Sequence, residues 1–190
     1  GDAPVTFTLP AGPYVRVEGT NLSLQVAGQT LTGDFTFEQT KTLGADGVAN
    51  TVDDETIVLF GVSKGELGIG DGTNTFVRIT DGHGVFVVRN GGLAGELGGT
   101  VVVDIPGVSF AGDFNLRINN TSAAVKYNLK VGTSTQTIDL AAGPFVRFEG
   151  GATTPVTLDI LGQKISGSVV VEQVKSAGTD GTLGTADDES

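Results

Sequence analysis

The chain has 190 residues, a formal net charge of −11, and no cysteine, methionine or tryptophan. This acidic balance excludes the basic surface that nucleic acids and anionic membranes require, and no apolar run approaches the roughly 18 residues of a membrane span. Because a chain without cysteine forms no disulfides, we expect packing, a metal ion or neighbouring subunits to stabilise the fold.

Alternation of apolar and polar residues with a period of two predicts β-strands along most of the chain, and no helical period is visible. In residues 108–118, for example, Val108, Phe110 and Phe114 share one face with further apolar residues, while small or polar residues take the other. In chain order, the clearest strand-like segments are 21–26, 108–118, 124–131, 156–160 and 165–174.

Glycine-rich segments separate these strands and supply the positive φ angles that tight hairpins need. They include 68–74 (GIGDGTN), 80–84 (TDGHG) and 89–92 (RNGG). Together, the strands and turns predict an all-β fold that is mostly antiparallel.

The chain also repeats itself. Residues 11–19 (AGPYVRVEG) return as 142–150 (AGPFVRFEG), and 28–39 (GQTLTGDFTFEQ) return as 162–173 (GQKISGSVVVEQ). We therefore predict one complete unit, 1–131, and a partial second unit, 132–190. Tandem units bury surface against their neighbours, so the repeat favours a role in assembly.

A smaller motif recurs inside the repeat: an apolar residue, any residue, glycine, a polar residue and an apolar residue. Its glycines are Gly33, Gly95, Gly112 and Gly167. Glycine on the inward face of a strand permits a bend, a bulge or the close approach of another backbone. This pattern favours a β-sandwich-like tandem repeat, with a β-solenoid as the alternative.

Two acidic loops, 44–55 (GADGVANTVDDE) and 178–189 (GTDGTLGTADDE), end the matching segments. The spacing from Asp46 to Asp53 is that of the second half of an EF-hand loop, but Thr42 and Gly44 stand where its leading acids would be. Ca²⁺ takes six to eight oxygen ligands, which carboxylates and backbone carbonyls can supply. We predict Ca²⁺ ligands at Asp46, Asn50, Asp53, Asp54, Glu55, Asp180, Asp187, Asp188 and Glu189; the alternative is two solvated acidic turns.

The repeated strand carries an arginine and a glutamate two residues apart, which places both on one face. Each set can form ion pairs within itself or with a glutamate of the following strand. The residues are Arg16, Glu18 and Glu38 in the first copy and Arg147, Glu149 and Glu172 in the second.

Nothing in the chain predicts an enzyme. The ion pairs supply no acid and base in a cleft, and the single histidine, His83, stands in a predicted turn without a partner motif. No nucleophile or phosphate-binding motif occurs. Asn21, Asn119 and Asn120 fit the acceptor pattern for N-glycosylation, although three matches barely exceed chance in a chain so rich in Ser and Thr.

The segments 11–19 and 28–39, the acidic loop and the turn 70–73 (GDGT) resemble the tandem β-repeats of very large bacterial extracellular and cell-surface proteins, including calcium-dependent adhesins. This resemblance implies a secreted, rigid array with Ca²⁺ at repeat junctions, used for adhesion or scaffolding.

The second unit has no counterpart of residues 56–131, which leaves unpaired strand edges. Either the chain is a window of a longer array, or a neighbouring subunit supplies the missing strands and forms a head-to-tail filament. A calcium-assisted carbohydrate-binding module is the alternative from another class. Its flat Trp or Tyr platforms are scarce here, with no Trp and two Tyr.

Overall fold

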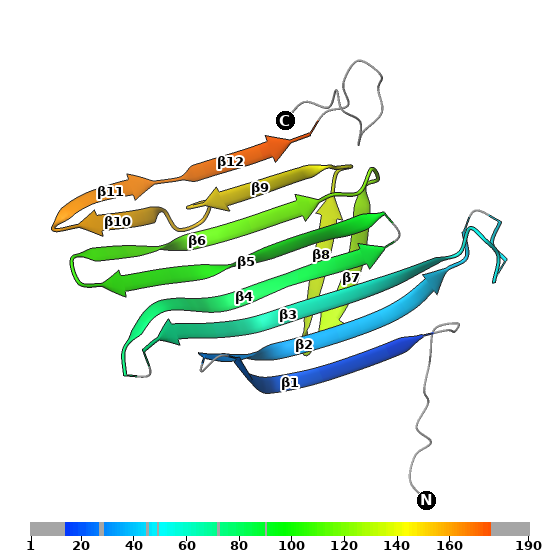
Figure 1. Cartoon of the computed structure of the whole chain (residues 1–190), viewed down its shortest axis with the longest axis horizontal. Helices are drawn as coiled ribbons and strands as arrows, with labels where there is room; N and C mark the ends of the chain where they lie inside the picture. The colour runs from blue at the N-terminus through cyan, green and yellow to red at the C-terminus, as the bar shows by residue number, and fades with distance from the viewer. Residues whose placement is uncertain are drawn as a thin grey trace, which may run out of the picture.

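The computed structural model describes residues 14–175 apart from 27, 28, 45, 49, 72 and 90, and its regular structure there consists entirely of β-strands. Ten strands form one antiparallel sheet that does not close (Figure 1). The other two, β7 (Val125–Val131) and β8 (Ser134–Leu140), form a hairpin that crosses one face of this sheet. The all-β prediction is confirmed, and the two layers are sandwich-like. No helix in the described residues is long and apolar enough to cross a membrane.

The first six strands are long, and each of the first five pairs with the next one in sequence. They are β1 (Val15–Val26), β2 (Gln29–Thr42), β3 (Glu55–Gly70), β4 (Thr75–Arg89), β5 (Gly92–Ile105) and β6 (Val108–Asn119). After the hairpin, β9 and β10 both pair with β6, and β12 and β11 pair with them on the outside. These strands are β9 (Phe145–Gly150), β10 (Val156–Ile160), β11 (Gln163–Gly167) and β12 (Val169–Val174).

Two of the three predicted glycine-rich turns are confirmed, and one prediction is wrong. Segments 68–74 and 89–92 contain the β3–β4 and β4–β5 connections. Segment 80–84 is not a turn, because β4 continues through it with a bulge between Thr80 and His83. Asp81 takes a φ of 53° there, and its carbonyl oxygen lies 2.7 Å from His83 Nδ1.

Register shifts interrupt the pairing of five neighbouring strands, β1 to β5. Gly33 lies at the shift between β2 and β3, opposite two residues of β3, where an added Cβ would stand 3.2 Å from the carbonyl oxygen of Ser63. Its counterpart Gly167 ends β11, just before the sheet continues as β12. At Gly33 the structure thus has the irregular pairing and close backbone approach that the motif predicts.

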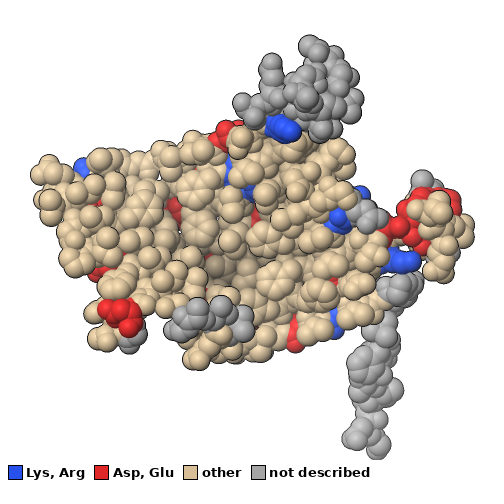
Figure 2. Space-filling view, in the orientation of Figure 1, with Lys and Arg blue, Asp and Glu red and all other residues tan. Residues whose placement is uncertain are grey.

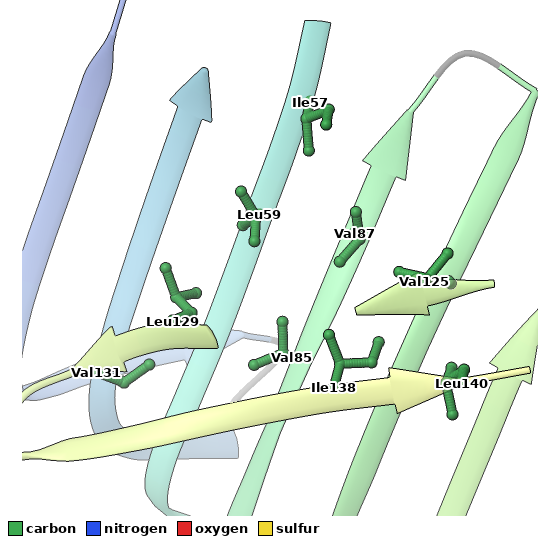
Figure 3. Close-up of a cluster of buried hydrophobic side chains, with 10 residues drawn as sticks. Ile57, Leu59, Val85, Val87, Val125, Leu129, Val131, Ile138 and Leu140 are labelled. Atoms are coloured by element: carbon green, nitrogen blue, oxygen red, sulfur yellow. The ribbon is translucent and has the colours of Figure 1, made fainter. Parts of the chain in front are cut away.

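The core lies between the β7–β8 hairpin and the middle of the large sheet (Figure 3). Leu129 and Ile138 of the hairpin are at most 1% exposed and pack against side chains of β3 and β4. Gly61 leaves room for this contact, since a Cβ there would overlap Val131. Burying one such side chain stabilises the fold by about 1.5–3 kcal/mol. The core residues are Ile57, Leu59, Val85, Val87, Ala94, Val125, Leu129, Val131, Ile138 and Leu140.

Candidate functional site

The first acidic loop joins β2 to β3 at one end of the sheet, where Figure 2 shows acidic side chains gathered. It carries five of the predicted Ca²⁺ ligands: Asp46, Asn50, Asp53, Asp54 and Glu55. The other four, Asp180, Asp187, Asp188 and Glu189, lie outside the described residues.

The carboxylates of this loop cap the loop's own backbone and hydroxyl groups. Asp46 Oδ1 accepts a hydrogen bond from the backbone N–H of Val48 (2.8 Å), and Asp53 Oδ1 accepts one from the Thr51 hydroxyl (2.7 Å). The backbone N–H of Asn50 donates to Asp54 Oδ2 at 2.5 Å. These local bonds hold the loop in a compact turn.

Two of the five predicted ligands, Glu55 and Asp54, differ in whether a carboxylate oxygen is available for a metal ion. Glu55 forms a two-bonded ion pair with Arg89 (2.6 and 3.1 Å), which raises the pKa of that arginine and occupies both glutamate oxygens. The side chain of Asp54 is 3% exposed, and its Oδ1 has no hydrogen-bond partner. In the described part of the chain no three acidic or histidine side chains converge as a metal site. The loop thus offers oxygen atoms without a preformed cage.

The repeated sequence forms the same hairpin at the two opposite edges of the sheet. In the first copy, β1 pairs with β2 from Val15↔Gln39 to Gly19↔Phe35. In the second copy, β9 pairs with β12 in the matching register, from Val146↔Gln173 to Gly150↔Val169. Beyond the glycine of the repeat, the registers of β1–β2 and β10–β11 match again. We call β1 and β2 the first hairpin. We call the four strands β9, β10, β11 and β12 the second hairpin, in which β9 and β10 correspond to β1, and β11 and β12 correspond to β2.

The outer edges of both hairpins are open. Within the described residues, β1 pairs only with β2, β12 only with β9, and β11 only with β10. The two edges run antiparallel to each other, as the arrows in Figure 1 show. Unpaired N–H and C=O groups along such edges are a template for another strand.

Each hairpin carries the predicted ion pairs, in the same geometry. Arg16 lies 3.1 Å from Glu18 and 2.9 Å from Glu38. In the second hairpin, Arg147 lies 2.6 Å from Glu149 and 3.0 Å from Glu172. The sequence prediction is confirmed in both copies.

The first set of ion pairs also holds the tip of the β7–β8 hairpin. Arg16 Nη2 donates to the carbonyl oxygen of Lys130 (2.7 Å), and Glu18 Oε1 accepts from the backbone N–H of Gly132 (3.0 Å). Thr36 of β2 adds a hydroxyl bond to the same Lys130 carbonyl at 3.0 Å. The first hairpin therefore binds the backbone of the turn that follows β7.

The second set of ion pairs contacts no such turn in the described residues. Arg147 donates its terminal nitrogens to Glu149 and Glu172, but its buried Nε has no partner. The bond from Arg147, together with the nearby Arg117 of β6, lowers the pKa of Glu149. The second hairpin thus repeats the ion pairs of the first hairpin but binds no counterpart of the β7–β8 turn.

The face of the large sheet opposite the β7–β8 hairpin is apolar, and no second layer covers it within the described residues. We call it the open face. It carries the predicted apolar side of residues 108–118. Phe35 stacks with Phe60 there (6.1 Å between ring centroids), and Phe114 stacks with Phe148 (6.5 Å). Figure 2, which views this face, shows only scattered charged side chains between its rims.

One predicted glycan acceptor is unsuitable in the folded chain. Asn119 is fully buried, and its amide donates to the carbonyl oxygens of Ala123 and Ala141 while accepting two bonds from Thr121. Asn120 and Asn21 are exposed, although Asn120 Oδ1 accepts a hydrogen bond from the N–H of Leu93. Asn119 is a structural residue that fixes the crossings between β6, the β7–β8 hairpin and β9.

Sequence reasoning identified the ion pairs but missed what the first set binds. No local pattern marks Lys130 and Gly132 as partners of a strand more than a hundred residues earlier. The repetition of Arg and Glu was the available signal, because it indicated a shared role without naming the contact.

The chain matches no known protein family, and no curated protein or solved structure is similar to it.

Proposed function

We propose that this protein is a structural subunit that assembles with copies of itself through the edges of its large sheet. The observation that supports this most directly is the pair of open edges, formed by one repeated hairpin at opposite sides of the sheet. Because the two edges differ from each other, a contact that joins them between copies is heterologous, so the copies join head-to-tail. Successive copies would extend one continuous antiparallel sheet into a filament.

The setting we propose for this assembly is a bacterial cell surface or extracellular filament, with a role in adhesion or scaffolding. The acidic repeat, the absence of cysteine and the resemblance of its segments to extracellular β-repeats support it. Ca²⁺ in the acidic loops belongs to the same proposal. It is supported by the oxygen-rich loop between β2 and β3 and by the unpartnered buried Oδ1 of Asp54.

The outward N–H groups of β12 offer a direct test. The N–H of Lys175 donates to Pro144 O on the β9 side, and alternation along an antiparallel strand then points the N–H of Val170 outward. Val170→Pro removes this donor without removing a bond to β9. We expect the variant to stay monomeric at concentrations where the parent chain forms larger species in multi-angle light scattering and filaments in electron microscopy.

Val170→Thr is the matched control, because it changes the same side chain and keeps the N–H. It should assemble at least as well as the parent chain. A parent chain that stays monomeric at all concentrations, or a proline variant that assembles equally well, would contradict assembly through this edge.

A further inference from the structure

The second hairpin is equivalent to the first in sequence, register and ion pairs, yet its outer edge has no partner in the described residues. We propose that the second hairpin of one molecule takes the place of the first hairpin beside β3 of a second molecule, so that copies join by hairpin exchange. This inference rests on the proposed self-assembly, and in place of direct pairing between the β12 and β1 edges it names β3 as the strand that the open edge of β12 binds.

The first hairpin shows what this position requires. Strand β2 pairs with β3 in the register Phe37↔Phe60 and Gln39↔Val58. In the repeat, Val171 corresponds to Phe37 and Gln173 to Gln39. The second hairpin would therefore present Val171 to Phe60 and Gln173 to Val58 of the other molecule.

Side-chain exposure differs between the two hairpins, as expected if the first is paired with β3 and the second has an unpaired outer strand. Thr36 is fully buried between β1, β3 and the β7–β8 turn, whereas its counterpart Val170 is 55% exposed. The neighbouring apolar residues of β12 are exposed as well. Covering them with β3 of a second molecule would remove this apolar edge from water.

The ion pairs supply the second contact. Beside β3, the first hairpin also meets the β7–β8 turn, which Arg16 and Glu18 bind through Lys130 O and Gly132 N. Arg147 and Glu149 occupy the corresponding places in the second hairpin, and Arg147 still has an unpartnered Nε. In the exchanged assembly, Arg147 and Glu149 would bind the β7–β8 turn of the second molecule, because that turn lies beside β3 of the same molecule.

The exchange conserves strand pairing. The donor keeps its whole sheet, since its second hairpin stays bound to β6 through β9 and β10. In the acceptor, the first hairpin leaves β3 as the second hairpin of the donor arrives. One hairpin–β3 contact is replaced by an equivalent one, as in domain swapping. The equilibrium between the monomer and the exchanged assembly then depends on the difference between the free energies with which the two hairpins bind β3.

Paired cysteines in the full chain test this register, and the chain has no cysteine of its own to interfere. Within one molecule, Gln173 and Val58 lie five strand spacings apart, roughly 24 Å, which is too far for a disulfide. In the exchanged assembly they are directly opposed. We expect oxidation of the Gln173→Cys, Val58→Cys variant to give a ladder of covalent dimers and larger species on a non-reducing gel.

The out-of-register control is Gln173→Cys with Val62→Cys, which shifts one cysteine by four residues, about 13 Å along β3. It should give little or no ladder. A second variant, Val170→Thr, restores the hydroxyl that Thr36 uses and should raise the cross-linked fraction of the first variant. One added neutral hydrogen bond corresponds to about a fivefold change in the equilibrium.

Light scattering of the same samples separates this inference from the proposed function. Larger species without the disulfide between positions 173 and 58 would overturn the exchange and leave assembly through the sheet edges standing. Monomers alone, with no such disulfide, would overturn both. Equal ladders from the in-register and out-of-register variants would also overturn the exchange.

Discussion

Asp34 is the residue at which the two copies of the hairpin differ most in chemistry. It is 2% exposed and lies on β2 beside the bulges of β1 and β3, where its carboxylate accepts the backbone N–H of Asn21 (2.8 Å) and forms an ion pair with Lys64 (3.0 Å). The hydrogen bond from Asn21 and then Lys64 lower the pKa of Asp34. Its counterpart Ser168 offers no charge, and Asp113 of β6 instead caps the nearby loop through Thr153 and Thr154.

The lowered pKa predicts how Asp34 contributes to stability as pH changes. Because the folded chain holds this carboxylate at a lower pKa than the unfolded chain, the contribution is complete above about pH 4 and is lost as pH falls through the folded value. Asp34→Asn should lower Tm at pH 7 by a few degrees, and the difference from the parent chain should shrink at pH 3. Thermal unfolding followed by circular dichroism at both pH values measures this difference in Tm.

The control for this prediction is Asp139→Asn, which removes an exposed ion pair with Lys126 (2.6 Å) on β7. Exposed pairs contribute little, so its stability should stay close to that of the parent chain at both pH values. An Asp34→Asn variant whose deficit is the same at pH 3 as at pH 7 would refute the proposed role of the carboxylate.

At the scale of elements, the sequence predicted the strands well because alternation and turn chemistry are local. The strand over 124–131 has the predicted burial, with Val125, Leu129 and Val131 facing the core. Segment 80–84 resembles a turn because a bulge, like a turn, uses a positive φ angle, which Asp81 adopts here. Gly82 and Gly84 instead allow the backbones of β3 and β5 to approach closely. The crossing of the β7–β8 hairpin over β3 and β4 depends on long-range packing, which no local pattern encodes.

The acidic loop between β2 and β3 predicts a measurable response to metal. If Asp54 Oδ1 is a Ca²⁺ ligand, adding Ca²⁺ should raise Tm, and EDTA should reverse the change. At one hundred times the Kd, a single site adds about 2.7 kcal/mol to the free energy of unfolding. Asp54→Asn should reduce this increment.

Asp71→Asn is a suitable control for the calcium prediction, because Asp71 caps the β3–β4 turn through the N–H groups of Thr73 and Asn74. It should keep the full response to Ca²⁺. A parent chain with the same Tm and the same assembly size in Ca²⁺ and in EDTA would show that the loop is only a solvated turn.

At the scale of the whole molecule, the sheet has two faces with different roles. One is covered by the β7–β8 hairpin and contains the core, while the open face exposes side chains such as Phe60 and Val17. Apolar residues alternate along nearly every strand, so the large sheet presents more apolar surface than a two-stranded hairpin can cover. Stability of the single molecule should therefore reside mainly in the covered layer.

Truncating one residue on each face tests this division. Leu129→Ala removes a side chain that is 1% exposed and leaves a cavity under the hairpin, so it should lower the free energy of unfolding by about 2–5 kcal/mol. Val17→Ala, at 62% exposure on the open face, should change it by less than about 0.5 kcal/mol in the monomer. Urea titrations at low protein concentration give both values. An equal loss from the two substitutions would mean that the open face is covered in solution, and the loss at Val17 should then grow with protein concentration if a second copy covers it.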